Sequence, residues 1–298
     1  MAQLRVAFLG LGAIGRPMAA RLAVMHDLTV WNRTAERSRV FQAGVRCRIA
    51  ESAAEAVATA EVVIPCLSTS KDVDELLNGP AAVATALKPG TLFLDCTSGD
   101  PATSRRLAAQ LAERGVAFAD CPVSGGTNGA EAGVLTVMVG GEPAVFARAR
   151  PILEAFGKLI VHVGPVGAGD TMKAINQVLL ASNILSLGEA LTAMVKAGVP
   201  ARAGIDVLNA SSGRSFVSEA LIPARVLTGS WPNTFRLALM DKDVKIALEL
   251  IGQLGLEAPL LERVAAGTAD ARAQLGEDAD YLEPIKLNER RAGVEVRE

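Results

Sequence analysis

Hydrophobic positions in the first 164 residues fall into short runs that are separated by helix-like segments. The apolar runs have the length of strands, and Ala-rich segments such as 16–25, 52–60 and 101–114 lie between most of them. Short apolar strands that alternate with helices predict a mostly parallel sheet with helices on both faces. The predicted strands are residues 4–9, 28–32, 45–49, 61–66, 91–96, 116–121, 135–139 and 158–163.

After residue 170 the apolar positions recur with the period of a helix. Apolar side chains such as Met172, Ile175 and Leu179 lie three and four residues apart, which predicts one long helix over 169–197. The sequence therefore predicts an α/β domain at 1–164 and an all-helical domain at 165–298, beginning with this helix. The further predicted helices are residues 201–210, 216–227, 234–252 and 258–275.

Composition argues against nucleic-acid and membrane partners. The 298 residues include 30 basic and 32 acidic side chains, for a formal net charge of −2, and aromatic residues make up 4%. Binding to a phosphate backbone needs clustered basic charge, and base stacking needs aromatic side chains. The N-terminus lacks a leader pattern, and no apolar run reaches the roughly 18 residues of a membrane span. The expected location is the cytoplasm.

The spacing of cysteine and histidine predicts no metal site. Cys66, Cys96 and Cys121 each end an apolar strand-like run, and the chain contains no CxxC pair. His26 and His162 are isolated from other candidate ligands in the sequence. We expect the thiols to be small buried hydrophobic side chains.

The first glycine-rich turn, GLGAIG, lies between a predicted strand and a predicted helix. In this G-x-G-x-x-G pattern the first glycine permits a tight turn, the second lets the backbone approach a pyrophosphate, and the third allows close helix–strand packing. The helix N-terminus adds free N–H groups and a positive dipole. The context predicts a dinucleotide site rather than a turn without a ligand. Its residues are Gly10, Leu11, Gly12, Ala13, Ile14 and Gly15.

The end of the second predicted strand bears on the choice of cofactor. An NAD site usually carries Asp or Glu about 20 residues after the glycines, where the carboxylate binds a ribose hydroxyl. Here the chain reads Asn32, Arg33, Thr34. No carboxylate would repel a 2′-phosphate, and the Arg33 guanidinium could pair with one. We therefore predict NADP, with NAD as the weaker alternative. The other interpretation is that Arg33 is a solvated loop residue.

A second glycine-rich turn, GPVGAG at 164–169, leaves two interpretations open. It could hold another phosphate, but its glycine order differs and no further strand–helix–strand unit follows. Alternatively, it is a crossover between the domains that aims the next helix at the cofactor. In that helix Lys173, Asn176 and Gln177 are spaced i, i+3 and i+4 and share one face. We favour the crossover, although a solvated helix face would show the same spacing.

A third loop, residues 122–127, follows a predicted strand end and lacks the Gly-Lys-Ser/Thr of a P-loop. Ser124, Gly125 and Gly126 offer a hydroxyl and successive backbone N–H groups without bulky side chains. Such donors at the carboxyl end of a strand can bind a substrate carboxylate. A plain connection between strand and helix is the alternative.

Four segments together resemble the signatures of the β-hydroxyacid dehydrogenases: GLGAIG at 10–15, CPVSGG at 121–126, GPVGAGDTMKAINQ at 164–177 and FRLALMDKDVKIA at 235–247. They occur in the family's order and span nearly the whole chain. The likeness is greatest to 3-hydroxyisobutyrate dehydrogenases. It implies a Rossmann-type α/β domain followed by an all-α domain, as in 6-phosphogluconate dehydrogenase.

The resemblance also implies roles for the matching residues. Lys173 corresponds to the general acid/base, and the 124–126 loop corresponds to the part that binds the substrate carboxylate. Asp243 is expected to orient Lys242. The other implied substrate contacts are Asn176, Gln177 and Phe235, and the other implied cofactor contacts are Leu67, Ser68, Thr97 and Lys242.

The predicted function is NADP-dependent interconversion of a short β-hydroxy acid, 3-hydroxyisobutyrate, and its semialdehyde, as in valine catabolism. The alternative enzyme activity is NADPH-dependent reduction of glyoxylate, succinic semialdehyde or tartronate semialdehyde. A non-catalytic NADP-binding protein would be expected to lose Lys173 or the 124–126 loop, and this chain keeps both. The resemblance further implies a small-molecule substrate and a homodimer or homotetramer.

Overall fold

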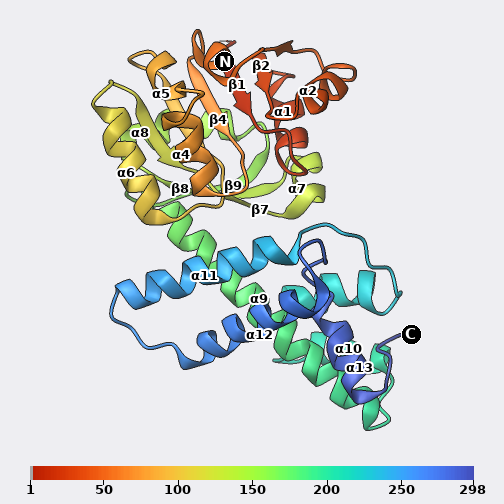
Figure 1. Ribbon diagram of the computed structural model, residues 1–298. Coiled ribbons are helices and arrows are strands. Elements are labelled where there is room, and N and C mark those ends of the chain that lie inside the picture. The colour runs from red at the N-terminus through yellow and green to blue at the C-terminus, as the bar shows by residue number, and fades with distance from the viewer. Residues whose placement is uncertain (1–2) are drawn as a thin grey trace. The chain divides into compact units, whose positions relative to one another are not determined.

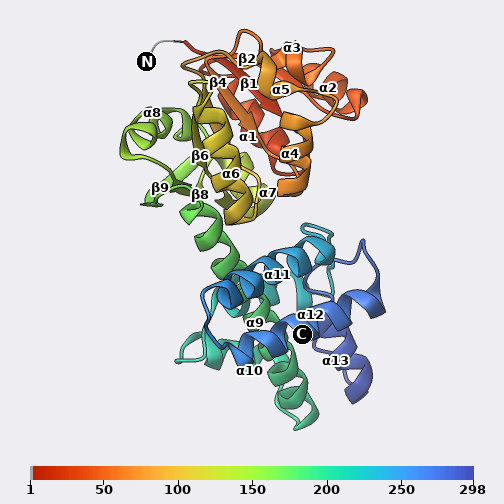
Figure 2. The same cartoon turned by 60° about the vertical axis from the view of Figure 1, so that its left-hand side comes forward.

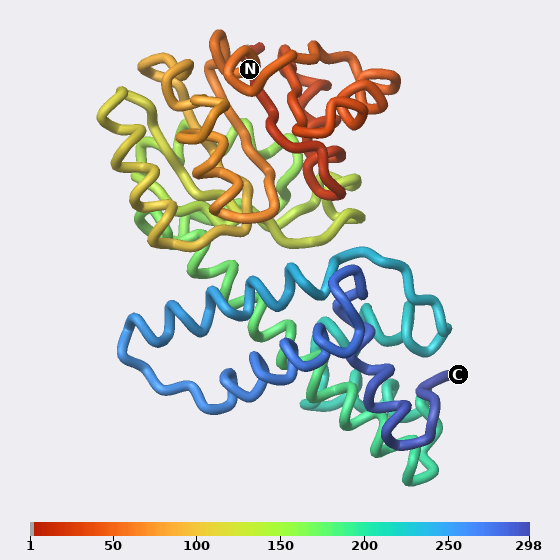
Figure 3. The backbone as a smooth tube through the Cα atoms, in the orientation of Figure 1, coloured from red at the N-terminus to blue at the C-terminus, as the bar shows by residue number. Residues whose placement is uncertain are grey.

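The computed structural model describes residues 3–298, which form two compact units, Met1–Lys173 and Ala174–Glu298. The first unit combines a sheet with helices, and the second is helical (Figure 1, Figure 3). This confirms the predicted fold class, an α/β Rossmann-type unit followed by an all-α unit.

The N-terminal unit is built on a sheet with the strand order β3-β2-β1-β4-β5-β6-β8-β7, and β9 pairs with β8. β1 to β6 run parallel to their neighbours, whereas β8 is antiparallel to β6 and β7. Every predicted strand overlaps an observed one, and only the two-residue β7 was not predicted. The strands are β1 (Arg5–Leu9), β2 (Asp27–Trp31), β3 (Arg48–Ile49), β4 (Val62–Pro65), β5 (Leu92–Asp95), β6 (Ala117–Asp120), β7 (Val123–Ser124), β8 (Leu135–Gly140) and β9 (Gly157–Gly164).

Alternation along β1 shows why helices cover both faces of the sheet (Figure 2). Val6 and Phe8 belong to one buried cluster, which also contains side chains of α1, α2, α7 and α8. Ala7 and Leu9 belong to another, with side chains of α3 to α6, because successive strand residues point to opposite faces. The helices are α1 (Gly15–Leu22), α2 (Ala35–Gln42), α3 (Ala53–Val57), α4 (Ser70–Asn78), α5 (Val83–Ala86), α6 (Pro101–Ala112), α7 (Gly126–Ala132) and α8 (Pro143–Leu153).

The C-terminal unit has a helical core of its own. The predicted helix at 216–227 is present as a π-helix, in which Pro223 cannot donate the i→i−4 hydrogen bond and crowds the preceding turn. The last helix was not predicted, because its sequence PIKLNERRA is mostly polar. The helices are α9 (Ala168–Lys196), which begins in the N-terminal unit, α10 (Ala201–Asn209), η1 (Val217–Val226), α11 (Leu237–Gln253), α12 (Pro259–Leu275) and α13 (Pro284–Ala292).

Within residues 3–298, α9 is the one helix that is long and apolar enough to span a membrane, with a mean hydropathy of 1.6 over its most apolar stretch. Core helices meet the same two criteria. Val178, Ile184 and Leu191 of α9 are buried in the core of the C-terminal unit. Packing in this core therefore explains why these three positions of α9 are apolar.

A buried ion pair holds the segment before α11 in the C-terminal unit. Arg225 Nη2 donates to Asp280 Oδ1 at 2.7 Å and to the Pro232 carbonyl oxygen at 2.6 Å. Asp280 Oδ2 accepts from the backbone N–H groups of Thr234 at 2.8 Å and Phe235 at 3.2 Å. Both charged side chains are buried, so each needs these partners to offset its lost hydration.

Replacing Asp280 with Ala should lower the free energy of unfolding by roughly 3–5 kcal/mol, because the Arg225 guanidinium would be left buried and unpaired. Chemical denaturation of the purified variant measures this loss. Asp278→Ala is the matched control. Asp278 is exposed, and its backbone carbonyl oxygen, which the substitution keeps, accepts from Asn233 Nδ2. Equal losses in the two variants would contradict the assigned importance of the ion pair.

Candidate active site

The carboxyl ends of parallel strands bring together the predicted site residues of the N-terminal unit. β1, β2, β4, β5 and β6 are parallel, so the loops that follow them leave from one edge of the sheet. Open α/β sheets bind their ligands at this edge. The loops contain Gly10, Asn32, Leu67 and Thr97, and Ser124 lies in the short strand β7 that follows β6.

The first glycine-rich turn has the geometry that a dinucleotide requires. A Cβ on Gly10 would lie 2.4 Å from the Cys66 carbonyl oxygen, and one on Gly15 would lie 2.1 Å from the Gly10 carbonyl oxygen. These two glycines are needed for the turn and for the packing of α1. A Cβ on Gly12 would meet nothing within 4 Å, so the backbone there is open to a ligand. The turn also contains Leu11, Ala13 and Ile14.

The loop after β2 contains a hydrogen-bonded amide, Asn32, and an exposed cation, Arg33. Asn32 Oδ1 accepts from the Leu11 N–H at 2.8 Å, and Asn32 Nδ2 donates to the Thr34 carbonyl oxygen at 3.0 Å. Asn32 thus ties the glycine turn to the end of β2. The Arg33 side chain is 85% exposed, and its Nη1 lies 3.6 Å from Asp72 Oδ1 on α4. A phosphate beside Arg33 would compete with Asp72 for the guanidinium.

Thr97 fixes the loops that follow β4 and β5. The Leu67 N–H donates to Thr97 Oγ1 at 3.0 Å, and the Thr97 N–H donates to Asp95 Oδ1 at 2.9 Å. Thr97 is buried, whereas Ser68 is exposed beside it. The two loops therefore share one hydrogen-bonded arrangement, and their contact with the cofactor stays a prediction.

The 124–126 loop is an open backbone turn. Ser124 ends β7 and pairs with Thr136 of β8. Gly125 and Gly126 have φ angles of +132° and +66°, which side chains with a Cβ rarely adopt. Both glycines are exposed, and a Cβ on Gly126 would meet nothing within 4 Å. A small anion can therefore approach this backbone, and carboxylate binding here stays a prediction.

The second glycine-rich turn connects β9 to α9. Gly167 has a φ of +90°, and its N–H donates to Asp120 Oδ1 at 2.7 Å. α9 begins at Ala168, and Lys173 is buried on its second turn. No strand follows Gly164 in the chain described up to residue 298, so a second nucleotide-binding βαβ unit is absent from those residues. This agrees with the crossover interpretation.

In the C-terminal unit, one carboxylate links a lysine to an amide. Asp243 Oδ1 lies 2.9 Å from Lys242 Nζ, and Asp243 Oδ2 accepts from Gln177 Nε2 at 3.0 Å. Asn176 Nδ2 donates to Gln177 Oε1 at 3.2 Å. The ring of Phe235 is half-buried and meets another aromatic ring edge-on. The contact between Lys242 and Asp243 agrees with the expected orienting role of Asp243.

Sequence reasoning missed two carboxylates that contact predicted site residues, Asp95 and Asp72, and a third, Asp120, that contacts the start of α9. Asp95 and Asp120 are the last residues of β5 and β6, so a polar side chain at a predicted strand end was an available signal. Asp72 lies in α4 and approaches Arg33 only in the fold, and no sequence spacing announces that contact.

Two buried thiols are unsuited to nucleophilic catalysis, and the described residues contain no cluster of metal ligands. Burial raises the pKa of Cys96 and Cys121 well above the ordinary value for a thiol, so neither is a thiolate nucleophile at neutral pH. Within residues 3–298, no group of three or more His, Cys, Asp or Glu side chains could hold a metal ion.

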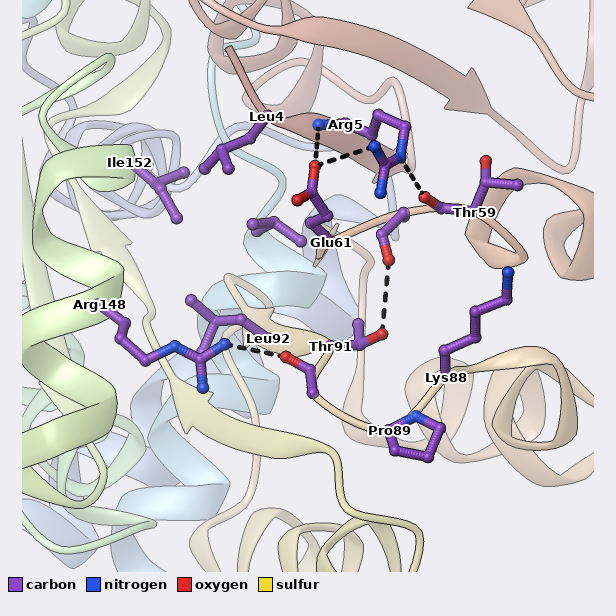
Figure 4. Close-up of a pocket in the computed structure, with 13 residues that line it drawn as sticks. Leu4, Arg5, Thr59, Glu61, Lys88, Pro89, Thr91, Leu92, Arg148 and Ile152 are labelled. Carbon is purple, nitrogen blue, oxygen red and sulfur yellow. Dashed lines mark hydrogen bonds and ion pairs between the residues drawn. The ribbon is translucent and has the colours of Figure 1, made fainter. Parts of the chain in front are cut away.

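A groove of about 820 Å³ lies at the opposite end of the strands (Figure 4). It includes residues at or near the starts of β1, β4 and β5, among them Arg5 and Glu61. Two of its cations have partners in the groove, since Arg5 Nε donates to the Thr59 carbonyl oxygen at 2.7 Å and Arg148 Nη2 to that of Gly90 at 2.9 Å. This groove is therefore separate from the glycine turn and the predicted site.

Two family models match successive parts of the chain. The model for the NAD binding domain of 6-phosphogluconate dehydrogenase matches residues 5–164. The model described as NAD-binding of NADP-dependent 3-hydroxyisobutyrate dehydrogenase matches residues 167–288. Both descriptions indicate a nicotinamide cofactor.

Known proteins resemble the chain over most of its length. It is 35% identical over 300 residues to 2-(hydroxymethyl)glutarate dehydrogenase of Eubacterium barkeri, covering 98% of this chain and 97% of that protein. It is 36% identical over 264 residues to a probable mitochondrial 3-hydroxyisobutyrate dehydrogenase of Dictyostelium discoideum, covering 86% and 81%. The structure of a Mycobacterium tuberculosis 3-hydroxyisobutyrate dehydrogenase with L-serine superimposes with a TM-score of 0.87 at 32% identity, covering 96% and 99%.

Proposed function

Because the chain belongs to the β-hydroxyacid dehydrogenase family, we propose that it interconverts 3-hydroxyisobutyrate and its semialdehyde with NADP as the cofactor. Family membership makes it an NAD(P)-dependent oxidoreductase that acts on a CH–OH group. The observation that carries the proposal is the placement of Lys173. It is buried on the second turn of α9, and the start of that helix is hydrogen-bonded to the end of β6, at the edge that also holds the glycine turn.

The names of the relatives point to one class of substrate. 3-Hydroxyisobutyrate, L-serine and 2-(hydroxymethyl)glutarate all carry a primary alcohol on the carbon next to the one that bears a carboxylate. They differ in the third substituent of that middle carbon, which is a methyl, an ammonium or a propionate group. We propose the methyl compound because the half-buried aromatic ring of Phe235 suits an apolar substituent.

The proposed roles follow from the chemistry of each group. In oxidation the Lys173 amine takes the proton of the substrate hydroxyl, and in reduction the ammonium returns a proton to the carbonyl oxygen. The nicotinamide ring, when bound, accepts or donates the hydride. The 124–126 loop holds the substrate carboxylate with the Ser124 hydroxyl and backbone N–H groups. Asn176 or Gln177 contacts the substrate, and Lys242 contacts the cofactor.

The preference for NADP rests on the loop after β2. It carries Arg33 and no carboxylate at its tip, and Asn32 Oδ1 accepts a hydrogen bond from the glycine turn. Arg33 is exposed and can pair with a 2′-phosphate. The neighbouring Asp72 opposes this pairing and should limit the preference.

We extend the proposal to the cellular context on the family resemblance alone. It comprises a cytoplasmic homodimer or homotetramer that acts in valine catabolism. The alternative activity is the reduction of glyoxylate, succinic semialdehyde or tartronate semialdehyde with NADPH. These compounds place the reacting carbonyl at other distances from the carboxylate or add a hydroxyl, so rates with a panel of aldehyde acids distinguish this activity.

Lys173→Ala should reduce kcat for 3-hydroxyisobutyrate by roughly 10²–10⁴-fold, the usual contribution of a general acid/base, while the Kd for NADPH stays nearly unchanged. Initial rates at 340 nm with a panel of hydroxy acids and aldehyde acids measure both the substrate choice and the loss. The exposed Lys158→Ala serves as the matched control. Parallel loss of NADPH binding would instead assign Lys173 to the cofactor site.

Arg33→Ala should raise KM for NADPH about 10-fold, the lower end for a lost hydrogen bond to a charged group, and leave KM for NADH nearly unchanged. Asp72→Asn should increase the selectivity for NADPH over NADH, because it removes the carboxylate that competes for the Arg33 guanidinium. Arg39→Ala on α2 is the control. An equal effect of Arg33→Ala on both cofactors would rule out a 2′-phosphate contact.

Ser124→Ala should weaken the discrimination between the substrate acid and its amide. In the wild type, amidation should lower kcat/KM strongly because the charge of the carboxylate is lost. Without the hydroxyl the acid-to-amide ratio should shrink about 10-fold, since a hydrogen bond to a charged group contributes about 1.5–3 kcal/mol. An unchanged ratio would show that this hydroxyl does not recognise the carboxylate.

A further inference from the structure

Asp120 is a buried carboxylate that receives the start of α9. It is the last residue of β6 and is 1% exposed. Its Oδ1 accepts from the Gly167 N–H at 2.7 Å, and its Oδ2 accepts from the Asp170 N–H at 2.9 Å. These donors belong to the residue before α9 and to its first turn, where N–H groups lack partners inside the helix. A side chain from the sheet therefore caps α9.

Asp170 fastens the same helical turn to a different part of the sheet edge. Its Oδ1 accepts from the Gly99 N–H at 3.0 Å, and Ser104 Oγ lies 2.6 Å from its Oδ2. Gly99 belongs to the loop after β5, and Ser104 lies on α6. The first turn of α9 is thus fixed from two sides within the N-terminal unit.

The surroundings of the two carboxyl groups leave little room for adjustment. A Cβ on Gly140 would lie 2.5 Å from Asp120 Oδ1, and one on Gly169 would lie 2.5 Å from the Met138 carbonyl oxygen. A Cβ on Gly99 would lie 3.2 Å from Asp170 Oδ2. Glycine at these positions allows direct contact between the helix start, the sheet and the carboxyl groups.

The two carboxyl groups have different surroundings, which shift their pKa values to different extents. Burial, followed by the charge of Asp120, raises the pKa of Asp170 well above its ordinary value. Burial also raises the pKa of Asp120, but several backbone N–H groups oppose that shift. Asp95 adds further negative charge near Asp170, and the Arg105 guanidinium lies beside Gly167. Of the two, Asp170 has the more strongly raised pKa, because fewer N–H groups oppose its burial.

We propose that Asp120 is a positioning residue for Lys173, an inference that rests on the proposed catalytic role of that lysine. Lys173 lies three residues beyond Asp170 on α9, and Ser124 lies four residues beyond Asp120 in the chain. One carboxylate therefore sets the position of the helix that carries the acid/base relative to the loop that holds the substrate carboxylate. Displacement of a catalytic group by about 1 Å can cost 10²-fold in rate.

Asp120→Asn should lower kcat about 10–100-fold through such a displacement and leave KM for the cofactor within about twofold. The amide offers one acceptor oxygen where the carboxylate offers two. Asp170→Asn should lower kcat less than Asp120→Asn does, because Asp120 still caps the start of α9. Asp100→Asn is the matched control, since Asp100 accepts from backbone N–H groups at the start of α6 and not of α9.

A double-mutant cycle separates positioning of Lys173 from a general structural role. If Asp120 acts through Lys173, Asp120→Asn should have almost no further effect on kcat in a Lys173→Ala background. Equal factors in both backgrounds would overturn the proposal. Should Lys173→Ala leave no measurable turnover, Lys173→Arg takes its place in the cycle. Full activity of the single variant Lys173→Ala would instead refute the proposed function, which keeps the two failures distinct.

A second variant covers the case in which Asp120→Asn does not fold, as judged by circular dichroism. Asp120→Ser adds no bulk beside Gly140 and keeps one hydroxyl oxygen that can accept from an N–H group. It should lower kcat at least about 10-fold with an unchanged KM for the cofactor, and this loss should again vanish when Lys173 is replaced. Wild-type kcat in Asp120→Ser, or a loss that persists without Lys173, would overturn the proposal.

Discussion

The close packing of α1 against the end of β1 is the contact on which the N-terminal unit depends. Gly15 lies so near the Gly10 carbonyl oxygen that a single methyl group would separate the two elements. At this distance the Leu11 N–H reaches Asn32 after β2, and the backbone of Gly10 meets that of Cys66 after β4. The lack of a side chain at Gly10 and at Gly15 thus allows the loops after β1, β2 and β4 to contact one another at one edge of the sheet.

Buried carboxylates fix the positions of loops and helix starts that the hydrogen bonds of the sheet do not hold. Asp95 and Asp120 end neighbouring strands and accept backbone N–H groups from the segments that follow or approach them. In the C-terminal unit, which has no sheet, Asp243 joins α9 to α11, and Asp280 holds the segment before α11. Buried acceptors of this kind specify loop positions because an unsatisfied N–H group would be costly.

The sequence predicted most of the fold because apolar runs and helical spacing are local signals. It could not predict β7, which is two residues long, or the π-helical form of η1, since both depend on tertiary pairing and packing. The glycine turn was predictable because Gly10 and Gly15 allow close backbone contacts and Gly12 leaves its backbone open. The contact of Arg33 with Asp72 was not, because it joins residues 39 positions apart on separate elements.

The exposure of Arg33 separates its proposed role in cofactor choice from the stability of the fold. Its side chain is 85% exposed and contributes to no hydrophobic core. Substitutions at such surface positions usually change stability by no more than about 0.5 kcal/mol. Asn32, by contrast, is committed to the glycine turn. Substitutions at position 33 that alter the proposed contact with a 2′-phosphate should therefore leave the fold intact.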